Sequence, residues 1–145
     1  MLSKKINLLM WSTFLIISLF SCKDKNETPQ DIYVEIPEDF VEFYDKFHSD
    51  TIYQIEHIHF PLEGIPAMSK GTDLEGFSFW WERDGWKYHK PFDAMDGTFT
   101  RDFSNFAGII TETIRDNSGQ FTMVRRFSKM DGEWKLIFYK QLSRG

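Results

Sequence analysis

The chain has 145 residues, a formal net charge of −5 and a single cysteine. One cysteine excludes an intrachain disulfide framework. An acidic surface argues against nucleic acid as a partner and against broad attraction to anionic lipids. About 110 residues of compact sequence are enough for one domain with one core.

The first 21 residues have the layout of a cleaved secretory signal. Lys4 and Lys5 precede an apolar run over 6–20, which is short for crossing about 30 Å of hydrocarbon. The letters LFSC at 19–22 resemble the bacterial lipobox, in which cleavage leaves cysteine first for lipid attachment. We therefore expect acyl chains such as palmitate on Cys22, which would hold the protein to a membrane. An uncleaved membrane anchor is the alternative.

Residues 22–35 are expected to form a lipidated cysteine followed by a flexible tether, because this polar stretch cannot bury enough surface to fold alone. The charged residues at 23–27 resemble export signals of surface lipoproteins in Bacteroidetes. They favour the outer membrane of the cell envelope, with the periplasmic and the surface-facing positions both open. Loss of the leader with its two lysines leaves 15 basic and 22 acidic residues, a net charge of about −7.

The remaining residues, 36–145, are expected to form a single α+β domain. Pro37 and the acids after it are typical of a helix start. An apolar stripe with helical spacing follows and ends near residues 48–50; its members are Phe40, Phe43, Tyr44 and Phe47. Thr51 and Gln54 have capping-box spacing, which predicts a second short helical turn.

An extended piece is expected over 56–60, where Pro61 stops it, and residues 62–73 are expected to form a loop. After the loop, a turn residue precedes glycine at regular intervals between apolar runs, which predicts an antiparallel meander. The four pairs are Asp84-Gly85, Asp96-Gly97, Ser118-Gly119 and Asp131-Gly132.

Two-residue turns at the last two of these pairs fix a strand register. Counting back from them sets Ile110 opposite Phe127, Ile114 opposite Met123, and Phe127 opposite Leu136. The residues then expected on one apolar face are Phe106, Ile110, Ile114, Met123, Phe127, Leu136 and Phe138.

The same register sets Glu112 opposite Arg125 on that apolar face. The pair could satisfy itself at the rim of the core, or the register could be wrong. A third interpretation is a polar anchor in a pocket, where the Arg125 fork grips a carboxylate. Aromatic residues, 17% of the chain, either fill the core or line such a site. The candidate pocket residues are Glu112, Arg125, Trp81, Tyr88 and Phe138.

Histidines supply the other candidate chemistry. His57 and His59 lie two apart on the expected strand, a spacing that suits metal ligands, and His48, Glu56 or His89 could complete a site. No cysteine pair or metalloprotease motif accompanies them, and we expect no metal or other cofactor. A histidine–carboxylate pair for acid/base catalysis stays open.

One or two helices, a loop and a curved sheet resemble the nuclear transport factor 2-like (NTF2-like), or cystatin-like, α+β fold, in which helices pack into the hollow of a bent antiparallel sheet. The last hairpin carries the likeness through Phe127, Asp131, Gly132, Trp134 and Leu136. A narrower resemblance, to the helix–FPL segment of an uncharacterised Bacteroidetes lipoprotein family, rests on Phe40, Phe43, Phe47, Asp50, Gln54, Ile58, Phe60, Pro61 and Leu62.

The resemblance implies a hollow that serves catalysis in some relatives and binding or association in others. No catalytic constellation carries over residue by residue, which favours a non-enzyme. The leading hypothesis is a lipid-anchored cell-envelope protein whose non-catalytic domain binds a small ligand or a protein partner; a homodimer stays open. One alternative is a small hydrolase or isomerase that uses a histidine with Glu112 or Asp50. Another is an inhibitor or immunity-type lipoprotein that plugs another protein.

Overall fold

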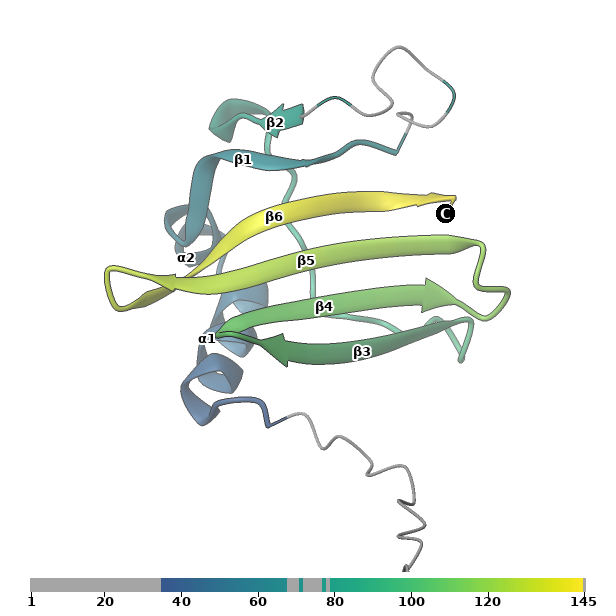
Figure 1. Cartoon of the computed structure of the whole chain (residues 1–145), viewed down its shortest axis with the longest axis horizontal. Coiled ribbons are helices and arrows are strands. Elements are labelled where there is room, and N and C mark those ends of the chain that lie inside the picture. The colour runs from purple at the N-terminus through teal and green to yellow at the C-terminus, as the bar shows by residue number, and fades with distance from the viewer. Residues whose placement is uncertain (1–34, 68–70, 72–76, 78, 145) are drawn as a thin grey trace, which may run out of the picture. The chain divides into compact units, whose positions relative to one another are not determined.

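The computed structural model describes residues 35–67, 71, 77 and 79–144. The predicted signal, Cys22 and nearly all of the predicted tether lie outside these residues. The elements in chain order are α1 (Glu38–Ser49), α2 (Thr51–Glu56), β1 (Ile58–Ile65), β2 (Phe79–Trp81), a 3₁₀ turn η1 (Arg83–Gly85), β3 (Phe99–Phe106), β4 (Ile109–Asp116), β5 (Phe121–Met130) and β6 (Glu133–Arg144) (Figure 1).

Helix α1 begins and ends as predicted. The Pro37 carbonyl accepts the first helical hydrogen bonds, and Glu38 and Asp39 occupy the first turn, where acids complement the helix dipole. Helix α2 is capped one residue earlier than predicted. The Asp50 carboxylate accepts from the backbone N–H groups of Ile52 and Tyr53, so the capping box expected at Thr51 is wrong. Neither described helix has the length and apolar character needed to cross a membrane.

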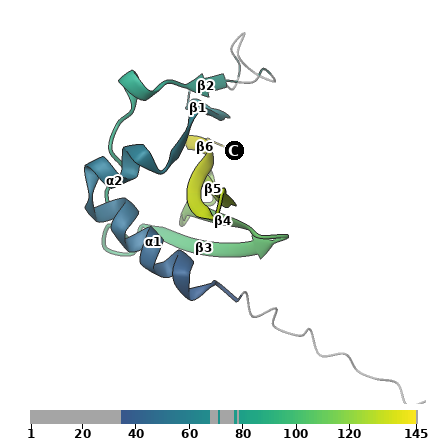
Figure 2. The same cartoon turned by 90° about the vertical axis from the view of Figure 1, so that its left-hand side faces the viewer.

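In the described part of the chain, the strands form one six-stranded sheet in the order β2-β1-β6-β5-β4-β3. Strands β3 to β6 form the predicted antiparallel meander. Strand β1 runs parallel to β6, so the sheet as a whole is mixed. Both helices lie on one face of this sheet (Figure 2). The predicted α+β fold class is confirmed.

The predicted register is confirmed from the β4–β5 turn through the start of β6. Ile110 pairs with Phe127, Ile114 with Met123, and Phe127 with Leu136. Beyond these pairs, a bulge opposite Arg126 and Phe127 gives β6 one extra residue. The β6 residues that follow it therefore lie on the opposite face of the sheet from the one predicted.

Two expected members of the apolar face therefore lie elsewhere. Phe138 pairs with Arg126, whose guanidinium lies 4.7 Å from the ring centroid, and Tyr139 takes the buried place instead. Phe106 ends β3 at a turn through Ala107 and Gly108 that the sequence reasoning missed, and 83% of it is exposed.

Other local predictions fail around the first two strands. Strand β1 continues through Pro61 to Ile65, so this stretch is not yet loop. Pro61 fits because it lies in the irregular part of the β1–β6 ladder, where its missing N–H leaves no ladder bond unmade. Asp84-Gly85 forms the 3₁₀ turn, and Asp96-Gly97 forms a turn that enters β3 from an irregular segment; neither makes a hairpin.

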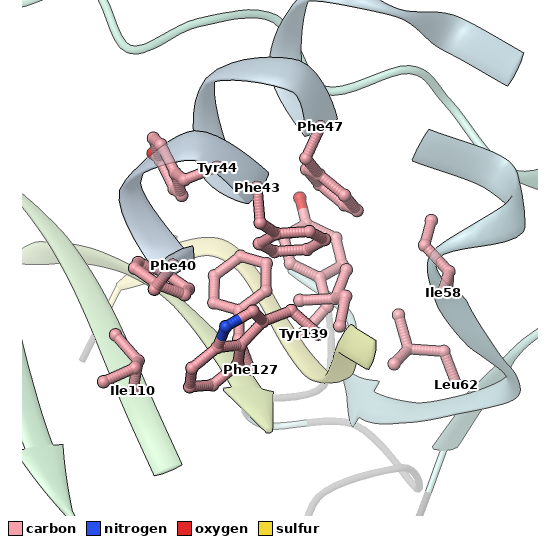
Figure 3. Close-up of a cluster of buried hydrophobic side chains, with 11 residues drawn as sticks. Phe40, Phe43, Tyr44, Phe47, Ile58, Leu62, Ile110, Phe127 and Tyr139 are labelled. Carbon is pink, nitrogen blue, oxygen red and sulfur yellow. The ribbon is translucent and has the colours of Figure 1, made fainter. Parts of the chain in front are cut away.

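The core lies between α1 and the middle of the sheet. Phe127 contacts the rings of Phe40, Phe43 and Phe47, with centroids 5.4–5.8 Å apart (Figure 3). Phe40 and Phe47 are at most 1% exposed. The predicted stripe of α1 therefore fills this part of the hollow.

Candidate functional site

Glu112 on β4 and Arg125 on β5 face each other across the ladder, as predicted, and are 1% and 2% exposed. Arg125 Nη2 donates to Glu112 Oε1 at 3.2 Å. Arg125 Nε lies 2.7 Å from Glu112 Oε2 as an ion pair, without the alignment of a hydrogen bond. The arginine fork therefore already holds a carboxylate, and that carboxylate belongs to the protein itself.

Tyr44 and Arg101 complete the surroundings of Glu112. The Tyr44 hydroxyl donates to Glu112 Oε1 at 2.5 Å, and burial raises the pKa of Tyr44 well above its usual value. Arg101 Nη1 lies 3.5 Å from the same hydroxyl, and its guanidinium lies over the rings of Phe92 and Phe103. The buried negative charge is thus matched by Arg125 and supported by a neutral phenol.

Two histidines contact the other side of Arg125. His48 Nδ1 donates a hydrogen bond to the Tyr44 carbonyl at 2.9 Å, which leaves His48 Nε2 to accept from Arg125 Nη1 at 2.6 Å. His89 Nδ1 lies 3.4 Å from the same Nη1. Burial, reinforced by Arg125, lowers the pKa of His48 to about 4 and that of His89 to about 2. Both rings are therefore neutral acceptors at neutral pH.

Gln54 fastens the chain that passes over this cluster. Its Oε1 accepts from His89 N at 2.8 Å and from Trp86 Nε1 at 3.2 Å, and its Nε2 donates to the His89 carbonyl at 2.9 Å and the Phe47 carbonyl at 2.7 Å. The Tyr88 hydroxyl donates a hydrogen bond to the His48 carbonyl. Trp86, Tyr88 and His89 belong to the segment 86–98, which crosses the sheet on the face that carries the helices (Figures 1 and 2).

A pocket of about 330 Å³ opens beside Arg125. Its wall is mostly apolar and comes from the 88–95 segment and from strands β3 to β6; the lining residues are Tyr88, His89, Lys90, Pro91, Phe92, Asp93, Met95, Phe99, Ile114, Met123, Arg125 and Leu142. A second pocket of about 300 Å³, the aromatic pocket, is lined by Trp81, Gly85, Trp86, Lys87, His89, Tyr139 and Gln141.

The structure brings together part of the predicted site. Arg125 and Tyr88 line the pocket of about 330 Å³, with Glu112 directly behind Arg125. Trp81 lies in the aromatic pocket, where its Nε1 donates to the Tyr139 carbonyl at 3.3 Å. Phe138 lies on the opposite face of the sheet, for the reason given above.

The sequence reasoning missed the roles of Tyr44, His48, Gln54 and His89. The spacing of Tyr44 and His48 gave a signal, because residues at i and i+4 share the helix face that carries the phenylalanine stripe. Gln54 was assigned to a capping box, and its actual partners come from a distant loop. Nothing local in the sequence marks that contact.

The strand histidines do not form the arrangement considered for a metal. His57 caps the end of α2 and stacks on Tyr53 at 3.7 Å, whereas His59 is exposed on β1. Within the described residues, no group of three or more histidine, cysteine or acidic side chains is placed to hold a metal ion.

No protein-family model and no curated protein matches the chain. Among solved structures, the chain is similar to an NTF2-like protein from Bacteroides fragilis, with 20% identity and a TM-score of 0.50 over 73% of this chain and 48% of that one. It therefore spans about half of that protein's length. An NTF2-like protein from Cytophaga hutchinsonii matches at 12% identity and a TM-score of 0.42, over 73% of this chain and 95% of that one. The likeness to the first structure, together with helices packed on the six-stranded sheet, confirms the predicted NTF2-like fold.

Proposed function

We propose that this protein binds a small, mostly apolar, uncharged ligand that carries a hydrogen-bond acceptor such as a ketone. The site is the pocket of about 330 Å³ beside Arg125, which we call the ketone pocket. The observation that carries the proposal is a buried arginine in an otherwise largely apolar wall. A volume of about 330 Å³ lies within the usual range for small-molecule pockets.

The partners of Arg125 decide the charge of the ligand. Glu112 neutralises the guanidinium, so Arg125 offers a second carboxylate no unpaired positive charge, and the exposed Lys90 and Asp93 that also line the pocket carry opposite charges. Each Nη atom carries two N–H groups, and Nη2 gives one to Glu112. No described residue takes the other, which can serve a carbonyl or hydroxyl oxygen of a ligand.

The same contacts favour binding over acid/base catalysis. His48 and His89 pair with Arg125 and not with Glu112, and their pKa values of about 4 and about 2 lie well below neutral pH. A general base works best when its pKa is close to the operating pH. The Asp50 carboxylate proposed as an alternative partner caps α2.

Titration calorimetry with methyl pentyl ketone, whose carbonyl adjoins a short alkyl chain, tests the proposal. We expect one site per chain with a Kd of about 0.1–1 mM. Met123→Trp fills the pocket and should weaken binding at least about tenfold. Val124→Trp is the matched control, because the next residue on β5 faces the other side of the sheet. Equal binding by the two variants, or none by the wild type, would contradict the proposal.

We extend the proposal to the location of the protein: Cys22 carries a lipid that anchors this binding domain in the cell envelope, in the outer membrane. The support comes from the sequence of the leader and the tether. The test is the mass and membrane fractionation of the wild type and Cys22→Ala. An unchanged mature mass with retained membrane binding in the variant would overturn it.

A further inference from the structure

Resting on the proposed function, we infer that the ketone pocket and the aromatic pocket are two halves of one elongated binding site, which the His89 side chain divides. Among the described residues, His89 is the one that lines both pockets. The two volumes of about 330 and 300 Å³ together give about 630 Å³, still within the range of small-ligand sites.

The His89 backbone is fixed by two hydrogen bonds, whereas its ring makes one long hydrogen bond. Gln54 bonds both the backbone N–H and the carbonyl of His89, at 2.8 and 2.9 Å. The ring makes one long contact with Arg125 at 3.4 Å, compared with 2.6 Å for His48 on the same nitrogen. Rotation of the ring would therefore break one long hydrogen bond and two aromatic contacts, while the backbone segment stays in place.

The aromatic neighbours of the His89 ring, which separates the two pockets as a partition, do not fix its position either. The His89 ring centroid lies 4.6 Å from that of Trp86 and 4.5 Å from that of Tyr139, both at tilted angles. A flat ring from a ligand can replace the imidazole in these contacts, because aromatic faces accept such partners in several orientations. Neutral His89 leaves Arg125 without breaking an ion pair, since its ring carries no charge at neutral pH.

The two walls then define the ligand class. The ketone pocket offers Phe99, Ile114, Met123 and Leu142 to an alkyl chain, and the aromatic pocket offers Trp81 and Trp86 to a planar ring. Arg125 lines the ketone pocket beside the partition, where it can donate to an oxygen between the two ends. The matching chemistry is an alkyl chain and a flat ring joined through a carbonyl.

A matched pair of probes tests the inference. Phenyl pentyl ketone differs from methyl pentyl ketone by a ring in place of a methyl group. In His89→Ala the partition is removed, so the ratio of the phenyl ketone affinity to the methyl ketone affinity should rise about tenfold over the wild type. His89→Phe keeps a ring in the same place and should leave the ratio near the wild-type value.

A second substitution tests whether the phenyl ring of the ligand binds in the aromatic pocket. Gln141→Trp, added to His89→Ala, narrows the aromatic pocket and should abolish the gain for the phenyl ketone. His89→Asn, with a shorter side chain, replaces the alanine variant if the latter fails to fold by thermal unfolding. An unchanged ratio in a folded small-residue variant overturns the shared site. If the wild type binds neither ketone, the proposed function fails instead, so the two failures are distinguishable.

Discussion

One face of the sheet carries two regions with opposite packing. Over one part, the stripe of α1 fills the hollow, and Phe47 and Phe127 are fully buried. Over the other, the irregular segment 86–98 covers the strands and leaves two pockets. A helix repeats large side chains toward the sheet every three or four residues, whereas an irregular segment has no such repeat. Side chains therefore fill the space between α1 and the sheet but not the space under the irregular segment, although two further pockets of about 500 and 140 Å³ flank α1.

The buried polar cluster of Tyr44, His48, Glu112 and Arg125 lies between these regions. Tyr44 and His48 come from the filled region, on the same helix as Phe40 and Phe47, and reach the pair on β4 and β5. Arg125 also lines the ketone pocket. Side chains of the region filled by α1 thus hold Arg125, which also lines a pocket of the other region.

The largest expected effect tests the contrast in packing. Phe47→Ala should lower the free energy of unfolding by about 4 kcal/mol, because it empties a fully buried site among aromatic rings. Met123→Ala should cost about 1 kcal/mol, because its half-buried side chain already borders a pocket. Urea unfolding measures both. Equal losses would show that the two regions pack alike.

The next effect tests the buried polar cluster. Glu112→Leu should lower the free energy of unfolding by about 3 kcal/mol, because it leaves Arg125 buried without its ion-pair partner. Adding Arg125→Met should recover most of the loss, since an apolar pair of similar size removes the stranded charge. Asp102→Ala is the matched control: its pair with Arg115 is exposed and should contribute little. A double variant as unstable as the single one would show that the pair is needed for more than charge balance.

The filled region could be predicted from the sequence far better than the hollow one. The spacing of Phe40, Phe43 and Phe47 predicted the helix and its buried face, and the turn at Ser118-Gly119 predicted the register that pairs Glu112 with Arg125. These features depend on periodicity and on short-range turn chemistry, which local sequence carries.

The hollow region depends on contacts that no local pattern encodes. Gln54 binds His89 across 35 residues, and the bulge on β6 exchanges Phe138 for Tyr139 without a glycine or proline to mark it. The pairing of Glu112 with Arg125 was predicted, but their relation to two histidines was not, because His89 lies in a segment that was expected to be a hairpin. Long-range packing decides each of these positions.

The smallest expected effect is a pH dependence of stability that comes from the two histidines beside Arg125. The folded-state pKa values of about 4 for His48 and about 2 for His89 are lower than the ordinary value near 6.5, so the unfolded chain binds more protons below about pH 6. Stability should then fall as the pH falls, by about 2 kcal/mol per pH unit for the two histidines together between pH 6 and pH 4. Urea unfolding across this range measures the slope. His89→Gln should make the slope shallower, whereas His59→Gln, which removes an exposed histidine on β1, should leave it as in the wild type. If both variants keep the full slope, the loss arises from groups other than the histidine that divides the two pockets, and His89 accepts a proton without opposition from Arg125.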